Sequence, residues 1–155
     1  MKNVNVGDAI PQFSLPDQNN EVINIADKIG NNILVIYFYP KDDTPGCTAE
    51  ACSFRDQYQD FTDAGAEVIG ISFDSPSRHK KFAAKHRLPF TLLSDSKKQV
   101  LKAFGVPTLM FGMLPGRVTY VVDRQGVIQH VYNSNANATQ HVQESLQIIK
   151  KLQEA

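Results

Sequence analysis

The sequence lacks the features that would mark a nucleic-acid-binding, membrane or secreted protein. Basic and acidic residues number 16 each, so the formal net charge is zero, and no basic block is present. Nucleic acids and anionic membranes are therefore not expected as partners. No apolar run reaches the roughly 20 residues needed to span a bilayer. Residues 1–4 lead into polar sequence, so we expect neither a membrane segment nor a signal peptide.

Signatures of cofactor binding are also missing. There is no glycine-rich loop of the kind that cradles phosphates. The four histidines are scattered at positions 79, 86, 130 and 141. Even on one helix, the first two would lie about 10 Å apart, too far to share a metal. We therefore expect no metal and no other cofactor. The length of 155 residues, of which 42% are hydrophobic, predicts a single domain over residues 1–155 with its own core.

One stretch, residues 37–52, contains both cysteines and organises the rest of the chain. The preceding run, residues 32–39, is continuously apolar and rich in β-forming residues, which predicts a strand covered on both faces. Pro40 ends that strand. Helix-start signals then follow in order, with Thr44 as the N-cap and Pro45 as the first helical residue. Gly46 allows close approach of the backbone to a bound group.

Cys47 falls in the first turn of this predicted helix. Backbone N–H groups without partners and the positive end of the helix dipole favour a thiolate there, which predicts a nucleophilic sulfur. The Thr44 hydroxyl, three residues earlier, either caps the helix or bonds the sulfur or an oxygen substrate. The plainer alternative is that Thr44 is only a cap and Cys47 a small buried side chain.

The spacing of Cys47 and Cys52 adds to this interpretation. Residues five apart in an intact helix have Cα atoms well over about 8 Å apart, whereas a disulfide tolerates up to about 7 Å. The two thiols therefore cannot form a structural bridge, but they can meet if the first turns unwind. This predicts a cycle in which Cys47 becomes a sulfenic acid and Cys52 condenses with it. Two unrelated thiols remain the alternative, and a transient disulfide fits a reducing compartment.

These residues carry a family resemblance. Pro40, Thr44 and Cys47 match the Pro-x-x-x-Thr-x-x-Cys signature of peroxiredoxins. The longer run Tyr-Pro-Lys-Asp-x-Thr-Pro-Gly-Cys-Thr-x-Glu-Ala-Cys resembles the subfamily called peroxiredoxin Q, or bacterioferritin comigratory protein. The similarity continues through residues 54–56, 71–75, 88–90, 93–95 and 114–117. It implies a thioredoxin-like fold, reduction of hydroperoxides and regeneration by thioredoxin, with Cys47 as the peroxidatic and Cys52 as the resolving cysteine.

The hydrophobic pattern predicts an α/β fold. A helix over 45–64 followed by a strand over 67–74 forms a βαβ crossover, which places Cys47 at the C-terminal edge of the sheet. With the resemblance, the prediction is a thioredoxin-like fold with a central mixed β-sheet flanked by helices. Residues 11–16 and 21–25 pair as an N-terminal hairpin extension. The remaining predicted elements are a helix over 75–87, a strand over 90–95, a short helix over 97–104, strands over 117–122 and 126–132, and a final helix burying Val142, Leu146, Ile149 and Leu152.

Four further features have two interpretations each. Arg117 follows a Pro-Gly turn at a strand entry, where position alone favours a surface arginine, but the resemblance makes it the catalytic arginine that stabilises the thiolate and binds peroxide. Glu50 is either a solvated helix residue or a carboxylate that pairs with arginine, and Arg55 is similarly ambiguous. The apolar loop 108–116 either folds onto the core or forms a collar or docking patch.

The sequence as a whole predicts an atypical two-cysteine, thioredoxin-dependent peroxidase. It would reduce hydrogen peroxide and organic hydroperoxides at a site formed by Thr44, Pro45, Gly46 and Arg117, with Pro40 shaping the pocket. A thioredoxin or similar dithiol protein would be the reductant, and the protein would be a cytoplasmic monomer or a mature organellar form. The alternatives are a thiol–disulfide oxidoreductase, which the Cys-x4-Cys spacing disfavours, and a peroxide-sensing redox switch.

Overall fold

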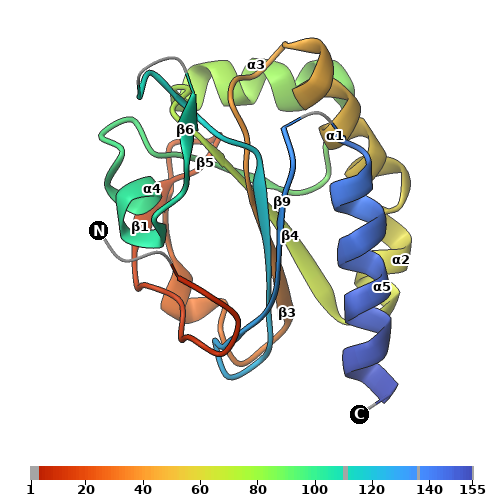
Figure 1. Ribbon diagram of the computed structural model, residues 1–155. Coiled ribbons are helices and arrows are strands. Elements are labelled where there is room, and N and C mark those ends of the chain that lie inside the picture. The colour runs from red at the N-terminus through yellow and green to blue at the C-terminus, as the bar shows by residue number, and fades with distance from the viewer. Residues whose placement is uncertain (1–3, 110–111, 136, 155) are drawn as a thin grey trace.

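The computed structural model describes residues 4–109, 112–135 and 137–154 (Figure 1). Its centre is a mixed sheet, as predicted, and the five strands lie in the order β5-β4-β3-β8-β9. The strands are β1 (Ser14–Pro16), β2 (Val22–Asn24), β3 (Ile33–Phe38), β4 (Ala66–Ser72), β5 (Thr91–Ser94), β6 (Thr108–Leu109), β7 (Leu114–Pro115), β8 (Val118–Val122) and β9 (Ile128–Asn133). The helices are the 3-10 helix η1 (Ile25–Asp27) and α1 (Pro45–Asp56), α2 (Tyr58–Asp63), α3 (Pro76–His86), α4 (Gln99–Phe104) and α5 (Gln140–Glu154).

The middle strand, β3, explains where the chemistry lies. All six of its residues are buried, as the apolar run predicts. It pairs in parallel with β4 and antiparallel with β8, so Phe38 lies opposite both Ile71 and Val118. Because β8 runs the opposite way, its beginning lies at the same sheet edge as the end of β3. The residue before β8, Arg117, is therefore brought to the loop that carries Cys47.

Two hydrophobic layers cover the sheet. Helices α1, α2 and α5 lie together on one face, while α4 and the N-terminal strands lie on the other (Figure 1). Alternation along β3 separates its side chains, with Tyr37 packing into the first layer and Phe38 into the second. The predicted apolar face of α5 is confirmed, since Val142 and Ile149 are buried in the first layer. No helix within the described ranges is long and apolar enough to cross a membrane.

The N-terminal hairpin forms as predicted. β1 and β2 pair antiparallel with Leu15 opposite Ile23. The turn is stabilised by Asp17, whose Oδ1 accepts hydrogen bonds from the backbone N–H groups of Asn19 and Glu21. The pair is a two-stranded sheet of its own, and it meets the central sheet through a bridge between Asp17 and Leu93.

The prediction of one helix over 45–64 is wrong in one respect, because the segment forms two helices, α1 and α2. Gln57, between them, has φ −105° and ψ 12°, outside the helical region. Phe54 and Phe61 are nevertheless both fully buried, so the expected apolar stripe continues across the break. Gly65 ends α2 as predicted, with φ +76° and its N–H donating to the Thr62 carbonyl.

The apolar loop 108–116 contains a short hairpin of β6 and β7. Lys98 Nζ donates a 3.0 Å hydrogen bond to the Gly112 carbonyl and ties the loop to the start of α4. The Met113 side chain is exposed, so this part of the loop is not folded onto the core. Met110 and Phe111 lie outside the described residues.

Candidate active site

Cys47 is the third residue of α1 and is buried, with 1% of its surface exposed. Pro45 begins the helix, and Thr44 precedes it with extended backbone, as the sequence predicts. The sulfur therefore lies beside the unpaired N–H groups of a helix N-terminus. Little solvent reaches the sulfur at this position.

Arg117 is the charged group that contacts Cys47. Its Nη2 donates to Cys47 Sγ over 3.4 Å, and its Nη1 donates to Glu50 Oε1 over 2.6 Å. Its backbone N–H donates to Asn135 Oδ1. The surface interpretation of Arg117 is wrong, since the residue is buried. A rigid guanidinium held on one side by a carboxyl group presents its other N–H groups to the sulfur.

Glu50, one turn after Cys47, is fully buried rather than solvated. Burial raises its pKa to about 8, against the opposing effects of the charge and hydrogen bond of Arg117. Its Oε2 has no hydrogen-bond partner and lies 3.8 Å from His141 Nδ1. The carboxyl group thus orients the guanidinium without fully neutralising it at pH 7. The positive charge remains directed at Cys47.

Thr44 differs from its predicted capping role. Its side chain makes no cap hydrogen bond, because Oγ1 donates its proton to the Lys41 carbonyl over 2.8 Å. With that proton engaged, the hydroxyl oxygen retains lone pairs that can accept a hydrogen bond from a bound hydroperoxide. Pro40, which follows the strand and Tyr39, is partly exposed at the start of the same loop.

Gly46 lies between this loop and the arginine. A Cβ added to Gly46 would lie 3.0 Å from Arg117 Nη2, a separation tighter than ordinary van der Waals contact. The sequence predicted that a group approaches the backbone closely at Gly46, and in the structure that group is the Arg117 side chain. A glycine here lets the guanidinium reach Cys47.

Cys52 is partly buried further along the same helix, and both thiols are free. The helix is continuous from Pro45 to Asp56, so the two sulfur atoms can bond only if α1 unwinds. Arg55 does not join the site. It donates to the His86 carbonyl and pairs with Asp56, which links the end of α1 to the end of α3.

His141 is a buried residue of this region that sequence reasoning missed. Its Nε2 donates to the Ser134 carbonyl over 2.7 Å, and its Nδ1 is 2.8 Å from Thr119 Oγ1. Burial lowers the pKa of His141 to about 4, so the ring is neutral near pH 7. Its position next to Val142, on the apolar side of the final helix, was the signal for burial.

Comparisons with known proteins show which family the chain resembles. A model of the AhpC/TSA family matches residues 6–131. Peroxiredoxin Q, chloroplastic, from Populus jackii is 51% identical over 149 residues, which cover 96% of this chain and 70% of that protein. Peroxidoxin BcpB from Mycobacterium tuberculosis superposes with a TM-score of 0.89 at 34% identity, over 95% of this chain and 97% of that one.

A third comparison adds a bacterial relative. The bacterioferritin comigratory protein of Xanthomonas campestris, solved in connection with its alkyl peroxide reduction activity, has a TM-score of 0.81 at 29% identity. The match covers 94% of this chain and 99% of that one. The fold is therefore the thioredoxin-like fold shared by peroxiredoxins, as predicted. The chain belongs to the AhpC/TSA family and, within it, to the peroxiredoxin Q subfamily.

Proposed function

We propose that this protein is a thiol-dependent peroxidase that reduces hydrogen peroxide and organic hydroperoxides through Cys47 and Cys52. The observation that carries the proposal is the 3.4 Å contact between Arg117 Nη2 and the buried Cys47 sulfur at a helix N-terminus. The names of the Populus and Xanthomonas relatives, a peroxiredoxin and a protein with alkyl peroxide reduction activity, support it.

The first step oxidises Cys47. Its thiolate attacks the terminal oxygen of the hydroperoxide, the O–O bond breaks, and the departing oxygen takes a proton to leave as water or an alcohol. Arg117 donates hydrogen bonds where negative charge develops, and the Thr44 oxygen accepts one from the peroxide. The product on the enzyme is a sulfenic acid.

The second step forms the disulfide. The beginning of α1 unwinds, the Cys52 sulfur attacks the Cys47 sulfenic acid, and water leaves. An external dithiol protein then reduces the disulfide by thiol–disulfide exchange and is itself oxidised. We propose thioredoxin or a similar dithiol protein as this reductant, because exchange needs a thiolate carried on an accessible protein surface.

The positions of the two cysteines also bear on the oligomeric state and the cellular location of the protein. Both cysteines lie in one helix, so resolution needs no second copy, and we propose a monomer formed by one domain over residues 1–155. A transient disulfide requires a reducing compartment. We propose the cytoplasm or, as a mature form, an organelle such as the chloroplast for which the Populus relative is named.

The test is a competition for limiting hydrogen peroxide between the reduced protein and free cysteine. The chain has no tryptophan, so intact mass is the readout. Wild type should outcompete free cysteine and lose about two mass units as the disulfide forms. Cys52→Ser should gain oxygen, and Cys47→Ser should be inert. Equal and slow reaction of all three would overturn the proposal, and rapid oxidation without turnover by thioredoxin would favour a redox sensor.

A further inference from the structure

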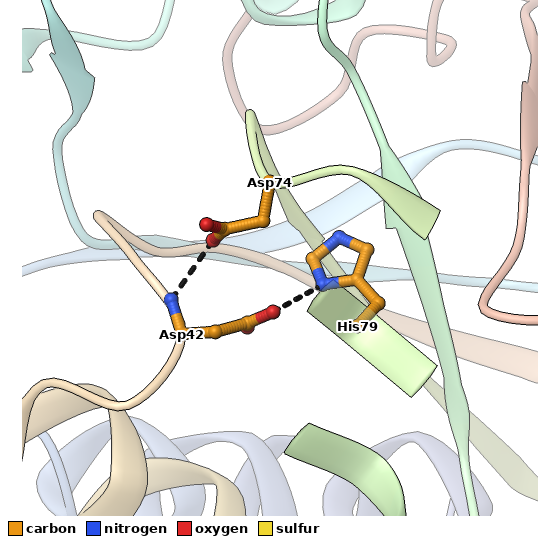
Figure 2. A group of neighbouring side chains, drawn as sticks. All are labelled: Asp42, Asp74 and His79. Carbon is orange, nitrogen blue, oxygen red and sulfur yellow. Dashed lines mark hydrogen bonds and ion pairs between the residues drawn. The ribbon is translucent and has the colours of Figure 1, made fainter. Parts of the chain in front are cut away.

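A buried polar cluster lies next to the loop that joins β3 to α1 (Figure 2). Asp42 belongs to that loop, Asp74 follows β4, and His79 lies on α3. Asp42 and His79 have 2% and 0% of their surface exposed. Neither belongs to the site of Cys47 and Arg117, and the proposed reaction does not use their side chains.

The hydrogen bonds of Asp42 connect three parts of the fold. Its backbone N–H donates to Asp74 Oδ2 over 2.8 Å, and its Oδ1 accepts from Tyr39 OH over 2.6 Å. Its Oδ2 lies 2.6 Å from His79 Nδ1 (Figure 2). The other ring nitrogen, His79 Nε2, lies 3.0 Å from the Leu93 carbonyl oxygen. The loop is thus bonded to the residue after β3, to the segment after β4 and to α3, and His79 is in turn bonded to β5.

These distances determine how many protons the pair carries. The Leu93 carbonyl can only accept, so His79 Nε2 must carry a proton. A second proton must lie between Nδ1 and Asp42 Oδ2, because two lone pairs would repel at 2.6 Å. Asp42 and His79 therefore share one proton and are neutral as a pair, which makes their burial less costly than that of a lone charge.

The arrangement suits a proton better than a metal ion. Asp42, Asp74 and His79 bring three ligand-type atoms within 4.8 Å of one another. Two ligands of a tetrahedral zinc ion lie about 3.3 Å apart, however, which is wider than the 2.6 Å between Nδ1 and Oδ2. Asp74 is already satisfied by Ser72 Oγ at 2.8 Å and by Arg78 Nε at 3.3 Å.

The segment held by this cluster is strained and leads directly to the active site. Asp43 has φ +64°, a left-handed conformation that costs more for a residue with a Cβ than for glycine, although aspartate tolerates it better than most. On one side of it lies Asp42, and on the other lies Thr44. The Thr44 hydroxyl donates to the carbonyl of Lys41, the residue before Asp42. A change in the backbone at Asp42 would therefore move the acceptor that orients the Thr44 hydroxyl.

We propose that Asp42 and His79 are positioning residues for peroxide reduction. Their shared proton holds the strained loop so that the Thr44 oxygen faces the substrate of Cys47. This inference rests on the proposed peroxidase function and assigns it two residues outside the site itself. The hydrogen bonds of the pair go to Tyr39, Asp74 and Leu93 and none goes to a residue of α1, so we expect it to act on oxidation of Cys47 and not on the unwinding that lets Cys52 react.

The test separates those two steps by rapid quenching and intact mass after mixing with hydrogen peroxide. His79→Phe should slow oxidation of Cys47 by about tenfold to a hundredfold, as expected for a displaced reacting group. The subsequent formation of the disulfide should change less than about twofold. If His79→Phe does not fold, Asp42→Ala replaces it, since Tyr39 OH lies 3.4 Å from His79 Nδ1 and can rebond there.

Two further variants define the role. Asp42→Asn keeps the network, because its amide can accept from Tyr39 and donate to a neutral His79, so oxidation should stay within about threefold of wild type. His130→Phe removes a partly exposed histidine of β9 and is the matched control, with no expected change. A folded His79→Phe protein with wild-type oxidation, or an Asp42→Asn protein as slow as His79→Phe, would overturn the positioning role. Wild type reacting no faster than free cysteine would instead overturn the peroxidase function and this inference together.

Discussion

Gly46 leaves Arg117 only the space that its guanidinium occupies, since a Cβ at Gly46 would lie 3.0 Å from Nη2. The same guanidinium is bonded to Glu50 and to Cys47. It can therefore not move aside without changing one of these contacts. The absence of a side chain at Gly46 thus allows the guanidinium to lie within hydrogen-bond distance of the Cys47 sulfur.

Gly46→Ala should consequently impair oxidation while leaving the fold intact. Alanine is favourable in a first helical turn, and Gly46 does not have a positive φ, so stability should be preserved. Displacement of Nη2 by a few tenths of an ångström should lower kcat/KM for peroxide by about tenfold or less. In an Arg117→Lys background the same substitution should have little further effect, and independent, additive losses would contradict the contact.

Arg117→Lys tests the two-sided hydrogen bonding of the guanidinium. Lysine keeps the charge but cannot bond Glu50 Oε1 and Cys47 Sγ with a planar pair of N–H groups. The expected loss in kcat/KM is on the order of 100-fold, typical of removing one preorganised donor. Arg124→Lys, an exposed arginine, is the matched control. Activity of Arg117→Lys near that of the control would show that charge alone is sufficient.

Unwinding of α1 can be tested at Ala49, an exposed position between the cysteines. Ala49→Gly removes no packing but weakens the helix by about 1 kcal/mol, so the unwound form should be about fivefold more populated. Disulfide formation after oxidation of Cys47 should accelerate by the same factor, as measured by quenched intact mass. Ala103→Gly, exposed in α4, should not change this rate. An unchanged rate in Ala49→Gly would mean that another step limits resolution.

The neutral His141 predicts a pH dependence of stability. Its pKa is lowered to about 4 in the folded protein by burial, whereas the unfolded chain has its ordinary value of 6.5. Between these values the unfolded chain binds more protons, so the contribution is complete above pH 6.5 and is lost as the pH falls toward 4. The raised pKa of the neighbouring Glu50 acts in the opposite direction over the same range, so the His141 contribution is read as a difference between variants. In urea unfolding, wild type should lose on the order of 2 kcal/mol relative to His141→Gln between pH 7 and pH 5.

The matched variant for this measurement is His141→Gln. It lowers stability at pH 7 by removing the Thr119 contact, but it should show a flatter pH profile than wild type. His130→Gln, at a partly exposed position, should keep the wild-type slope. Equal slopes for wild type and His141→Gln would contradict the assignment.

The elements that form by local signals could be predicted from the sequence. The buried run of β3, the start of α1 at Pro45 and the turn of Gly65 depend on neighbouring residues, and each lies where expected. The break at Gln57 could not be predicted, because neither glycine nor proline marks it.

Within the site, only the residues that belong to a recognisable sequence motif could be predicted. The burial of Arg117 follows from the antiparallel register of β8 against β3, which no local pattern determines. The bond between Asp42 and His79 joins residues 37 positions apart. The sequence left open whether the Thr44 hydroxyl caps the helix or bonds the sulfur or a substrate. In the structure it donates to the Lys41 carbonyl. The features that could not be predicted are therefore those that depend on contacts between residues far apart in the sequence.

The unequal exposure of the two thiols has a consequence for chemical labelling. Cys47 is almost fully covered, whereas Cys52 is only partly buried. A bulky maleimide should therefore modify Cys52 first in the reduced, folded protein, even though the proposed reaction with peroxide begins at Cys47. Burial of Cys47 should admit a small peroxide and exclude larger electrophiles, so steric exclusion would add to the chemical selectivity proposed for this cysteine.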